Sequence, residues 1–215
     1  MVRALGEWAH SGRLTHDLAS SLWRAYAGLT LGVLAGALIG VIAGQVAWLR
    51  NAVVPIVSLF RPIPPVAMIP LVIVWAGIGD ASKVLSTAFA CFFPMFTAAY
   101  QGATNVPESY LWAARSAGLS GTAVLARIVF PATLNVAIAG LRVSIAVAFV
   151  MCFVSELAGS SQGLGYEIST MSLNYRIDRM MAALGVLAAS AAVTDVVAVG
   201  FIGFVCPWIG KDRGT

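Results

Sequence analysis

Side chains that bind metal ions or form disulfides are scarce in this sequence. There are two histidines, His10 and His16, and three cysteines, Cys91, Cys152 and Cys206, each inside an apolar segment. The cysteines are odd in number and share no CxxC spacing, so they indicate neither a disulfide framework nor a zinc site. An HExxH motif is also missing, and no metal is predicted.

The motifs of nucleotide-binding and hydrolytic enzymes are absent as well. No GxxxxGK[ST] stretch occurs, and the only Gly-Lys pair, Gly210–Lys211, follows an apolar segment. A GxSxG nucleophile elbow is missing too. We therefore expect no catalytic residue and no cofactor in this chain. If ATP drives its activity, a partner subunit binds the ATP and Mg²⁺.

Charge is sparse. Only 10% of the residues are Asp, Glu, Lys or Arg, and the 13 basic residues are scattered singly despite a net charge of +4. Nucleic-acid binding requires a clustered basic surface, so no nucleic-acid partner is predicted. The same basic residues divide almost evenly between the two sides of a five-span arrangement, and they do not decide its orientation.

What remains is a series of long apolar segments. Hydrophobic residues make up 60% of the chain, and the mean hydropathy is +0.89. A helix needs about 20 apolar residues to cross a bilayer core of about 30 Å. Five segments approach that length: residues 26–48, 53–77, 82–102, 132–157 and 180–209. The sequence predicts an all-α polytopic membrane protein of about five transmembrane helices, embedded in a lipid bilayer.

The predicted transmembrane domain, residues 26–209, is flanked by an N-terminal segment, residues 1–25, and a tail, residues 210–215. The N-terminal segment has no apolar stretch of the kind found in a secretory signal. Its apolar residues recur at every fourth position opposite polar ones: Leu14, Leu18, Leu22 and Tyr26. This pattern is typical of an amphipathic helix lying in the membrane interface.

Glycine recurs at every fourth residue of the first predicted span: Gly28, Gly32, Gly36, Gly40 and Gly44. Such a stripe lets another helix approach closely, which is how helices pack in lipid. We interpret it as a packing surface rather than a pore lining.

The second predicted span contains RPIPPVAMIP, with prolines at positions 62, 64, 65 and 70. Proline removes a helical hydrogen bond and disturbs the preceding residue, so a regular helix cannot run through this stretch. Irregular backbone at membrane depth is tolerated where protein buries it or where it lines a water-filled cavity. The stretch is therefore a candidate wall of a transport pathway.

Three charged residues, Arg142, Glu156 and Asp195, lie in or beside predicted spans, where charge is costly and raises a functional question. In a structural interpretation Arg142 extends to the interface and Asp195 caps or bonds a neighbour. For Glu156 a structural and a pathway role are equally open. A proton relay would need several such groups along one or two helices.

Residues 109–131, SYLWAARSAGLSGTAVLARIVFP, are too polar to form a span. Asn105 and Glu108 have the spacing of a capping box, Pro107 suits a first turn, and Gly118 is a stop signal, so a short helix is predicted. Its small side chains share one face, which suits insertion into a groove of a partner: Tyr110, Ala113, Ala114 and Ala117.

The same stretch resembles the EAA signature, E-A-A-x3-G-x9-I-x-L-P, of the membrane-spanning subunits of ATP-binding-cassette importers. The matching positions are Ala113, Ala114, Gly118, Ile128 and Pro131, whereas Trp112 replaces the usual Glu and Phe130 the usual Leu. Residues 61–84, 131–146 and 155–168 are similar to permeases of the nitrate, sulfonate and taurine group. This similarity extends from about residue 11 to residue 209.

The resemblance implies a type I importer core in which a coupling helix, at about residues 106–127, docks on the ATPase subunit at the cytoplasmic side. It also implies a binding protein outside, near a Gly163-Leu164-Gly165 loop at the outer gate, a second copy of the chain, and a bacterial inner (plasma) membrane. The residues expected to couple to the ATPase are Trp112, Ala113, Ala114, Arg115, Gly118 and Pro131. Those expected in the pathway or gate are Arg61, Pro62, Pro64, Pro65, Glu156, Ser160, Ser161, Gly163 and Gly165.

The resemblance places Arg115 and Lys211 on the cytoplasmic side and Lys83 and Arg176 outside, with the N-terminus outside. Relatives usually have one more N-terminal span, so the chain resembles the five-helix core. An indole at position 112 offers apolar contact and one N–H donor in place of a carboxylate. We expect coupling to depend on the shape of Ala113, Ala114 and Gly118.

The sequence thus predicts the permease subunit of an ATP-driven importer for a small anion or organic solute, working by alternating access. One alternative is an ATP-independent secondary transporter or channel, which the lack of several intramembrane charges disfavours. Another is a structural membrane subunit without a pathway, which the broken second span disfavours.

Overall fold

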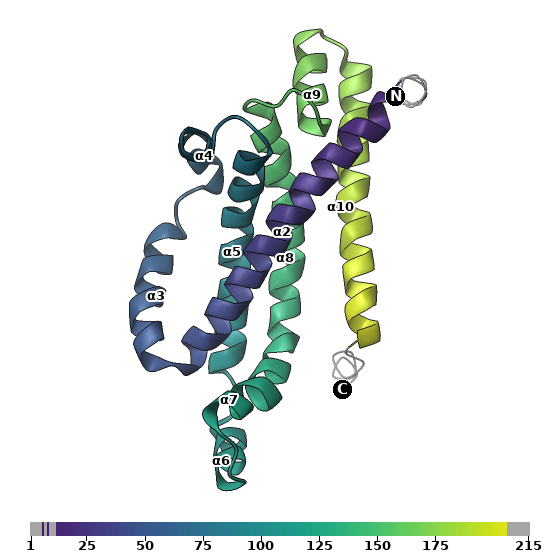
Figure 1. Ribbon diagram of the computed structural model, residues 1–215. Helices are drawn as coiled ribbons and strands as arrows, with labels where there is room; N and C mark the ends of the chain where they lie inside the picture. Colours follow the sequence, from purple (N-terminus) through teal and green to yellow (C-terminus); the bar gives the residue numbers. More distant parts are fainter. Residues whose placement is uncertain (1–5, 7, 9–11, 206–215) are drawn as a thin grey trace.

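The computed structural model describes residues 6, 8 and 12–205, and the regular elements of this part of the chain are all helical (Figure 1). In chain order they are α2 (Arg13–Gln45), α3 (Ala47–Phe60), η1 (Pro65–Met68), α4 (Ile69–Ala76), α5 (Asp80–Thr104), α6 (Glu108–Ser116), α7 (Gly121–Val124), η2 (Leu125–Val129), α8 (Phe130–Leu157), α9 (Leu164–Leu173) and α10 (Ile177–Val205). Four helices are long and apolar enough to cross a membrane, and α3 with α4 makes up to five. The predicted all-α polytopic class is confirmed.

The connecting helices gather at two opposite ends of the bundle (Figure 1). One end carries α6 and α7, and the other carries α9 together with the start of α2. We call them the α6 end and the α9 end. The long helices α2, α5, α8 and α10 run between these ends, so the two ends present different surfaces for partners.

Helix α5 packs along α2, and the glycine stripe of α2 forms the contact. A Cβ atom added at Gly28, Gly36 or Gly44 would lie 2.5–2.7 Å from an atom of α5, closer than side chains pack. Gly32 and Gly40 face the same helix. The interpretation of this stripe as a packing surface is confirmed.

The second predicted span is broken, as its prolines require. Helix α3 ends at Phe60, and the following pair, η1 and α4, is bent from it by 92°. Pro65 starts η1 and Pro70 lies in the first turn of α4, where a missing N–H costs nothing. With 14 residues at 1.5 Å each, α3 is about 21 Å long, shorter than a bilayer core of about 30 Å.

The return from α7 into α8 passes through one wide helical turn, η2. The backbone N–H of Phe130 donates to the carbonyl of Leu125, five residues back. Proline at position 131 has no N–H, and its ring would clash with the carbonyl four residues earlier in an ordinary helix. A π-type turn relieves that clash, and such turns are frequent at functional sites.

Two sequence-based expectations differ from the structure. Residues 13–25 do not form a separate interfacial helix, because α2 runs unbroken from Arg13 to Gln45 and buries Asp17, Ser21 and Arg24 against the bundle. Asn105 does not cap α6: it ends α5, and α6 begins after Pro107 without a side-chain cap. The predicted tail, the end of the last span at residues 206–209, Cys206 and most of residues 1–11 lie outside the described residues.

Candidate functional site

The α6 end is organised by a tight helix stop at Gly118. Its backbone N–H donates to the Arg115 carbonyl, and the Leu119 N–H donates to the Ala114 carbonyl, the two bonds of a Schellman motif. Gly118 has φ +77°, a left-handed conformation that favours glycine. The predicted stop signal is therefore correct, and it turns the chain sharply out of α6 towards α7.

The signature residues of α6 divide between two faces. Trp112, Ala113 and Arg115 are exposed, and the indole of Trp112 is 67% accessible. Ala114 is only 4% exposed and faces the chain itself. The predicted single face of small side chains is thus wrong for Ala114: an adjacent helical residue points about 100° away, and here that direction is inward.

The inward face of α6 joins the apolar core of the bundle. Ala114 belongs to one buried cluster with Val41 of α2, Ala99 of α5, Val124 of α7 and Ala137 of α8. Pro131 lies in the first turn of α8, directly after the wide turn. Because close-packed interiors transmit displacement, a force on α6 can pass to three long helices through this shared cluster.

At the α9 end, Glu156 is the centre of a buried polar cluster. The Ser21 hydroxyl lies 2.8 Å from both carboxylate oxygens, and Arg24 Nη1 donates to Oε1 at 2.7 Å. The Gly165 N–H donates to Oε2 at 2.9 Å. Since Glu156 is 1% exposed, this carboxylate ties α2 to α8 and to the start of α9.

Further hydrogen bonds attach the loop before α9 to the same cluster. Asp17 accepts from the Gly163 N–H, and Ser21 accepts from the Leu164 N–H. Arg24 also pairs with Asp80 at 2.8 Å, which joins α5 to the cluster. One arginine therefore links α2, α5 and α8, and the loop is held by side chains far from it in sequence.

The glycines of this loop fit around the carboxylate. A Cβ atom on Gly163 would lie 2.5 Å from Glu156 Oε1, and its φ of +116° is left-handed. A Cβ atom on Gly165 would lie 2.7 Å from Glu156 Cβ. The GLG sequence is thus explained by close approach of the backbone to a buried acid.

Of the residues predicted for the outer gate, only the two serines contact an open hollow. Ser160 and Ser161 line a hollow of about 330 Å³ with Asp80 and Lys83, whereas Glu156, Gly163 and Gly165 are buried. The sequence-based interpretation missed Asp80, which pairs with Arg24, and the three residues of α2 that join the Glu156 cluster: Asp17, Ser21 and Arg24. Their three- and four-residue spacing in α2 was the available signal, and it was interpreted as the polar face of an interfacial helix.

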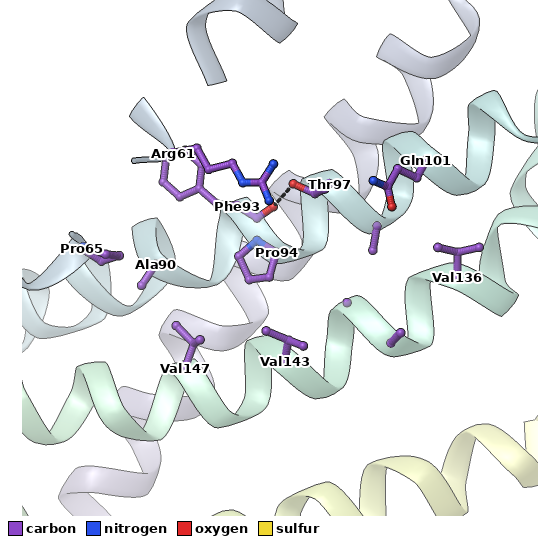
Figure 2. A pocket seen from close by; sticks show the side chains of 13 residues that line it. Arg61, Pro65, Ala90, Phe93, Pro94, Thr97, Gln101, Val136, Val143 and Val147 are labelled. Atoms are coloured by element: carbon purple, nitrogen blue, oxygen red, sulfur yellow. Dashed lines mark hydrogen bonds between the residues drawn. The ribbon is translucent and has the colours of Figure 1, made fainter. Parts of the chain in front are cut away.

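A larger groove, of about 480 Å³, lies between the break after α3 and the helices α5 and α8 (Figure 2). Of the four predicted wall residues, Arg61 and Pro65 line this groove and Pro62 and Pro64 do not. The remaining lining residues are mostly apolar: Ala90, Phe93, Pro94, Thr97, Ala98, Gln101, Val136, Ala139, Gly140, Val143 and Val147. Arg61 is the only charged residue among all those that line this groove.

Arg142 and Asp195 form a two-pronged ion pair between α8 and α10. Arg142 Nε and Nη2 donate to the two carboxylate oxygens at 3.0 and 2.9 Å. Hence Asp195 bonds a neighbour, as one interpretation expected, and Arg142 pairs rather than extending to the interface. The pair lines a second hollow that shares Ala139 and Val143 with the groove, so the two concave surfaces are continuous.

Among the described residues there is no group of three or more His, Cys, Asp or Glu side chains able to hold a metal ion. The two described cysteines, Cys91 and Cys152, are buried within the bundle. The features present are an apolar groove with one arginine, an exposed helix packed onto the bundle, and a bent span. These define a multi-pass helical membrane transport protein.

The chain belongs to a family described as binding-protein-dependent transport system inner membrane components, whose profile matches residues 29–210. It is 31% identical to the taurine transport system permease protein TauC of Escherichia coli over 92% of this chain and 72% of the relative. It is 30% identical to the putative aliphatic sulfonates transport permease protein SsuC of Bacillus subtilis, over 91% and 71%. The resemblance to importer permeases is confirmed.

Solved structures agree on the fold. An inward-facing structure of the MetNI methionine ABC transporter superposes with a TM-score of 0.75 at 19% identity, covering 89% of this chain and 95% of that one. An amino acid ABC transporter solved with histidines gives 0.68 at 16% identity, covering 94% and 96%. These structures share the fold of the chain, while the family and the relatives support an importer permease and not an ATP-independent transporter or channel.

Proposed function

We propose that this chain lines the solute pathway of an ATP-driven importer for a small sulfonate-like anion in a bacterial inner membrane. The observation that carries the proposal is the packing of α6. Its outward face, with Trp112 and Ala113, is exposed, and its inward face shares one apolar cluster with α2, α5 and α8. An ATPase that grips the outward face would therefore move the membrane helices.

The solute class is suggested by the relatives. TauC is described as a taurine permease and SsuC as a putative permease for aliphatic sulfonates, and both cover most of this chain. ATP binding by the partner would shift the pathway between inward-open and outward-open populations, with no chemistry on the solute.

Two copies of the chain would enclose the pathway. Only 11% of the apolar window of α10 is buried inside the chain. The Arg142–Asp195 pair is also half-exposed, with side-chain exposures of 52% and 30%. Charged groups at membrane depth generally face a protein partner or a water-filled cavity rather than lipid. This face of α8 and α10 is accordingly the one we assign to the second copy and the pathway.

In this arrangement the α9 end faces a substrate-binding protein outside the cell, and the α6 end lies in the cytoplasm. The α9 end exposes large side chains where α9 passes into α10, namely Leu173, Tyr175 and Ile177, and it also carries the loop held by the Glu156 cluster. A loop fixed by so many hydrogen bonds gives the binding protein a rigid surface to dock on.

We expect Ala113→Glu to reduce co-purification of the ATPase at least tenfold, and ATP-driven uptake with it. The new carboxylate would enter the contact that the small side chain now allows, and a buried, unpaired charge is costly. Since Ala113 is exposed in the chain, folding should be unchanged. The measurement is the ATPase to permease ratio after affinity purification, followed by uptake in proteoliposomes.

The matched control is Ala158→Glu, an exposed alanine at the α9 end. It should leave the ATPase to permease ratio at the unmodified level. Equal ratios for Ala113→Glu and the unmodified chain would remove α6 from the contact.

A further inference from the structure

Arg61 lines the groove at the break after α3 and has no carboxylate partner among the described residues. It follows α3 directly, and its N–H donates to the Val57 carbonyl, so its backbone still belongs to the last helical turn. Since α3 is only about 21 Å long, shorter than a bilayer core of about 30 Å, the broken span continues beyond Arg61 into η1 and α4. None of the five ion pairs found in the described part of the chain includes Arg61.

The side chain of Arg61 extends along α5 with its guanidinium towards Thr97 (Figure 2). The Thr97 hydroxyl donates to the Phe93 carbonyl at 2.9 Å, so its proton is already used and its oxygen keeps a free acceptor position. Gln101, one helical turn further, lines the same groove and contributes an amide donor. Arg61 at the break and Gln101 of α5 thus both bring N–H donors to the lining of the groove.

The electrostatic balance of this surface is positive. In the adjoining hollow, Arg142 is neutralised by Asp195 through two hydrogen bonds. Arg61 therefore supplies the net charge of the continuous concave surface. Its planar guanidinium, with several donors in a fixed fork, suits the oxygens of a sulfonate or carboxylate.

The wall opposite Arg61 is apolar. Val136, Val143 and Val147 of α8 line it, and no acidic residue appears among the lining residues of the groove. A short alkyl chain would be accommodated here, whereas an ammonium group would find no carboxylate.

We propose that Arg61, with Gln101, forms an anion-coordinating site for a small oxyanion with a short apolar tail, of the alkanesulfonate type. This rests on the proposed function in placing the site on the solute pathway. The anion would pair with Arg61 by two parallel hydrogen bonds while its tail contacts the valines.

The test uses the charge of a thiol reagent as a probe and needs no ATPase. A cysteine replaces Ala139, which is exposed and lines both hollows. Cys206 is replaced by Ser, and the remaining cysteines are buried. Labelling rates are measured on the purified full chain with anionic sulfonatoethyl methanethiosulfonate and with cationic trimethylammonioethyl methanethiosulfonate.

The measured quantity is the labelling rate with the anionic reagent divided by the rate with the cationic reagent. With Arg61 present, this ratio at position 139 should be roughly tenfold higher than at a cysteine replacing Ser120, which lies outside the groove. That excess is the size expected for one nearby charge in a partly desolvated site. Arg61→Gln should remove most of this excess, Arg61→Lys should retain it, and Arg127→Gln, the same charge loss at an exposed site, should leave it unchanged. Ethanesulfonate should slow labelling at position 139, and tetramethylammonium should not.

Equal ratios at positions 139 and 120 in the Arg61 protein would overturn the site even if Arg61→Gln failed to fold. An unchanged ratio in a folded Arg61→Gln protein would do the same. Failure of ATP-driven uptake alongside a normal labelling ratio would instead contradict the importer function and leave the anion site intact.

Discussion

Replacing Gly36 with valine is expected to abolish accumulation of the folded chain, with at least a tenfold fall in monodisperse protein after detergent extraction. A Cβ atom at this position would lie 2.7 Å from the Phe92 carbonyl oxygen and 2.9 Å from the Phe96 nitrogen, both backbone atoms of α5. Backbone atoms cannot move aside as a flexible side chain can. The two helices would have to separate, and their close packing is what holds them together in lipid. The measurement is fluorescence-detected size-exclusion chromatography of a tagged chain.

Gly200 supplies the matched control, because a Cβ atom there would meet nothing within 4 Å. Gly200→Val carries the same change of helix propensity without the clash, and it should keep most of the folded yield. Gly36→Ala should give an intermediate yield. A normal yield for Gly36→Val would show that α2 and α5 do not pack along the glycine stripe.

Replacing Glu156 with leucine is expected to destabilise the chain by about 3 kcal/mol, the lower end of the usual cost of breaking a buried ion pair, because Arg24 would keep only the more exposed Asp80. Arg24, which is 3% exposed, would lose its 2.7 Å partner, and the N–H of Gly165 would lose its acceptor. The thermal unfolding midpoint in detergent should fall sharply, and the loop at residues 158–163 should become sensitive to protease.

The double variant Arg24→Met with Glu156→Leu separates two causes of instability, namely a buried charge without its partner and the loss of the contact itself. Removing both ions avoids an isolated buried charge, and Asp80, whose side chain is 56% exposed, remains hydrated. We expect the double variant to regain much of the lost stability, while Glu108→Leu at an exposed site changes little. If Glu156 instead served the solute pathway, Glu156→Leu would keep its unfolding midpoint and lose only uptake.

The main lines of the fold were predictable because lipid imposes simple rules. The length of the apolar segments predicted the spans. The glycine stripe of α2 predicted a packing surface, and the prolines near Arg61 predicted a break. The continuity of α2 through residue 25 was not predictable from the local sequence pattern. A polar face on a helix looks the same whether it meets headgroups or, as with Ser21 and Asp17, a buried acid and a loop backbone of the same chain.

The candidate sites were predictable in position and only partly in role. The signature located α6, and its glycine stop proved correct, but the inward direction of Ala114 depends on how α6 sits against α7 and the bundle. The partners Arg24 and Glu156 are 132 residues apart, and Arg142 and Asp195 are 53 apart. Pairings of this kind are set by tertiary packing, and the spacing of residues in the sequence does not predict them.

The most direct test of the docking of α6 is site-specific photocrosslinking of the assembled transporter. A benzoylphenylalanine at position 112, whose indole is 67% exposed at the α6 end, should crosslink to the ATPase subunit. The same group at position 175, where Tyr175 is 88% exposed at the α9 end, should not. Crosslinking from position 175 and none from position 112 would contradict both the docking surface and the orientation of the chain in the membrane.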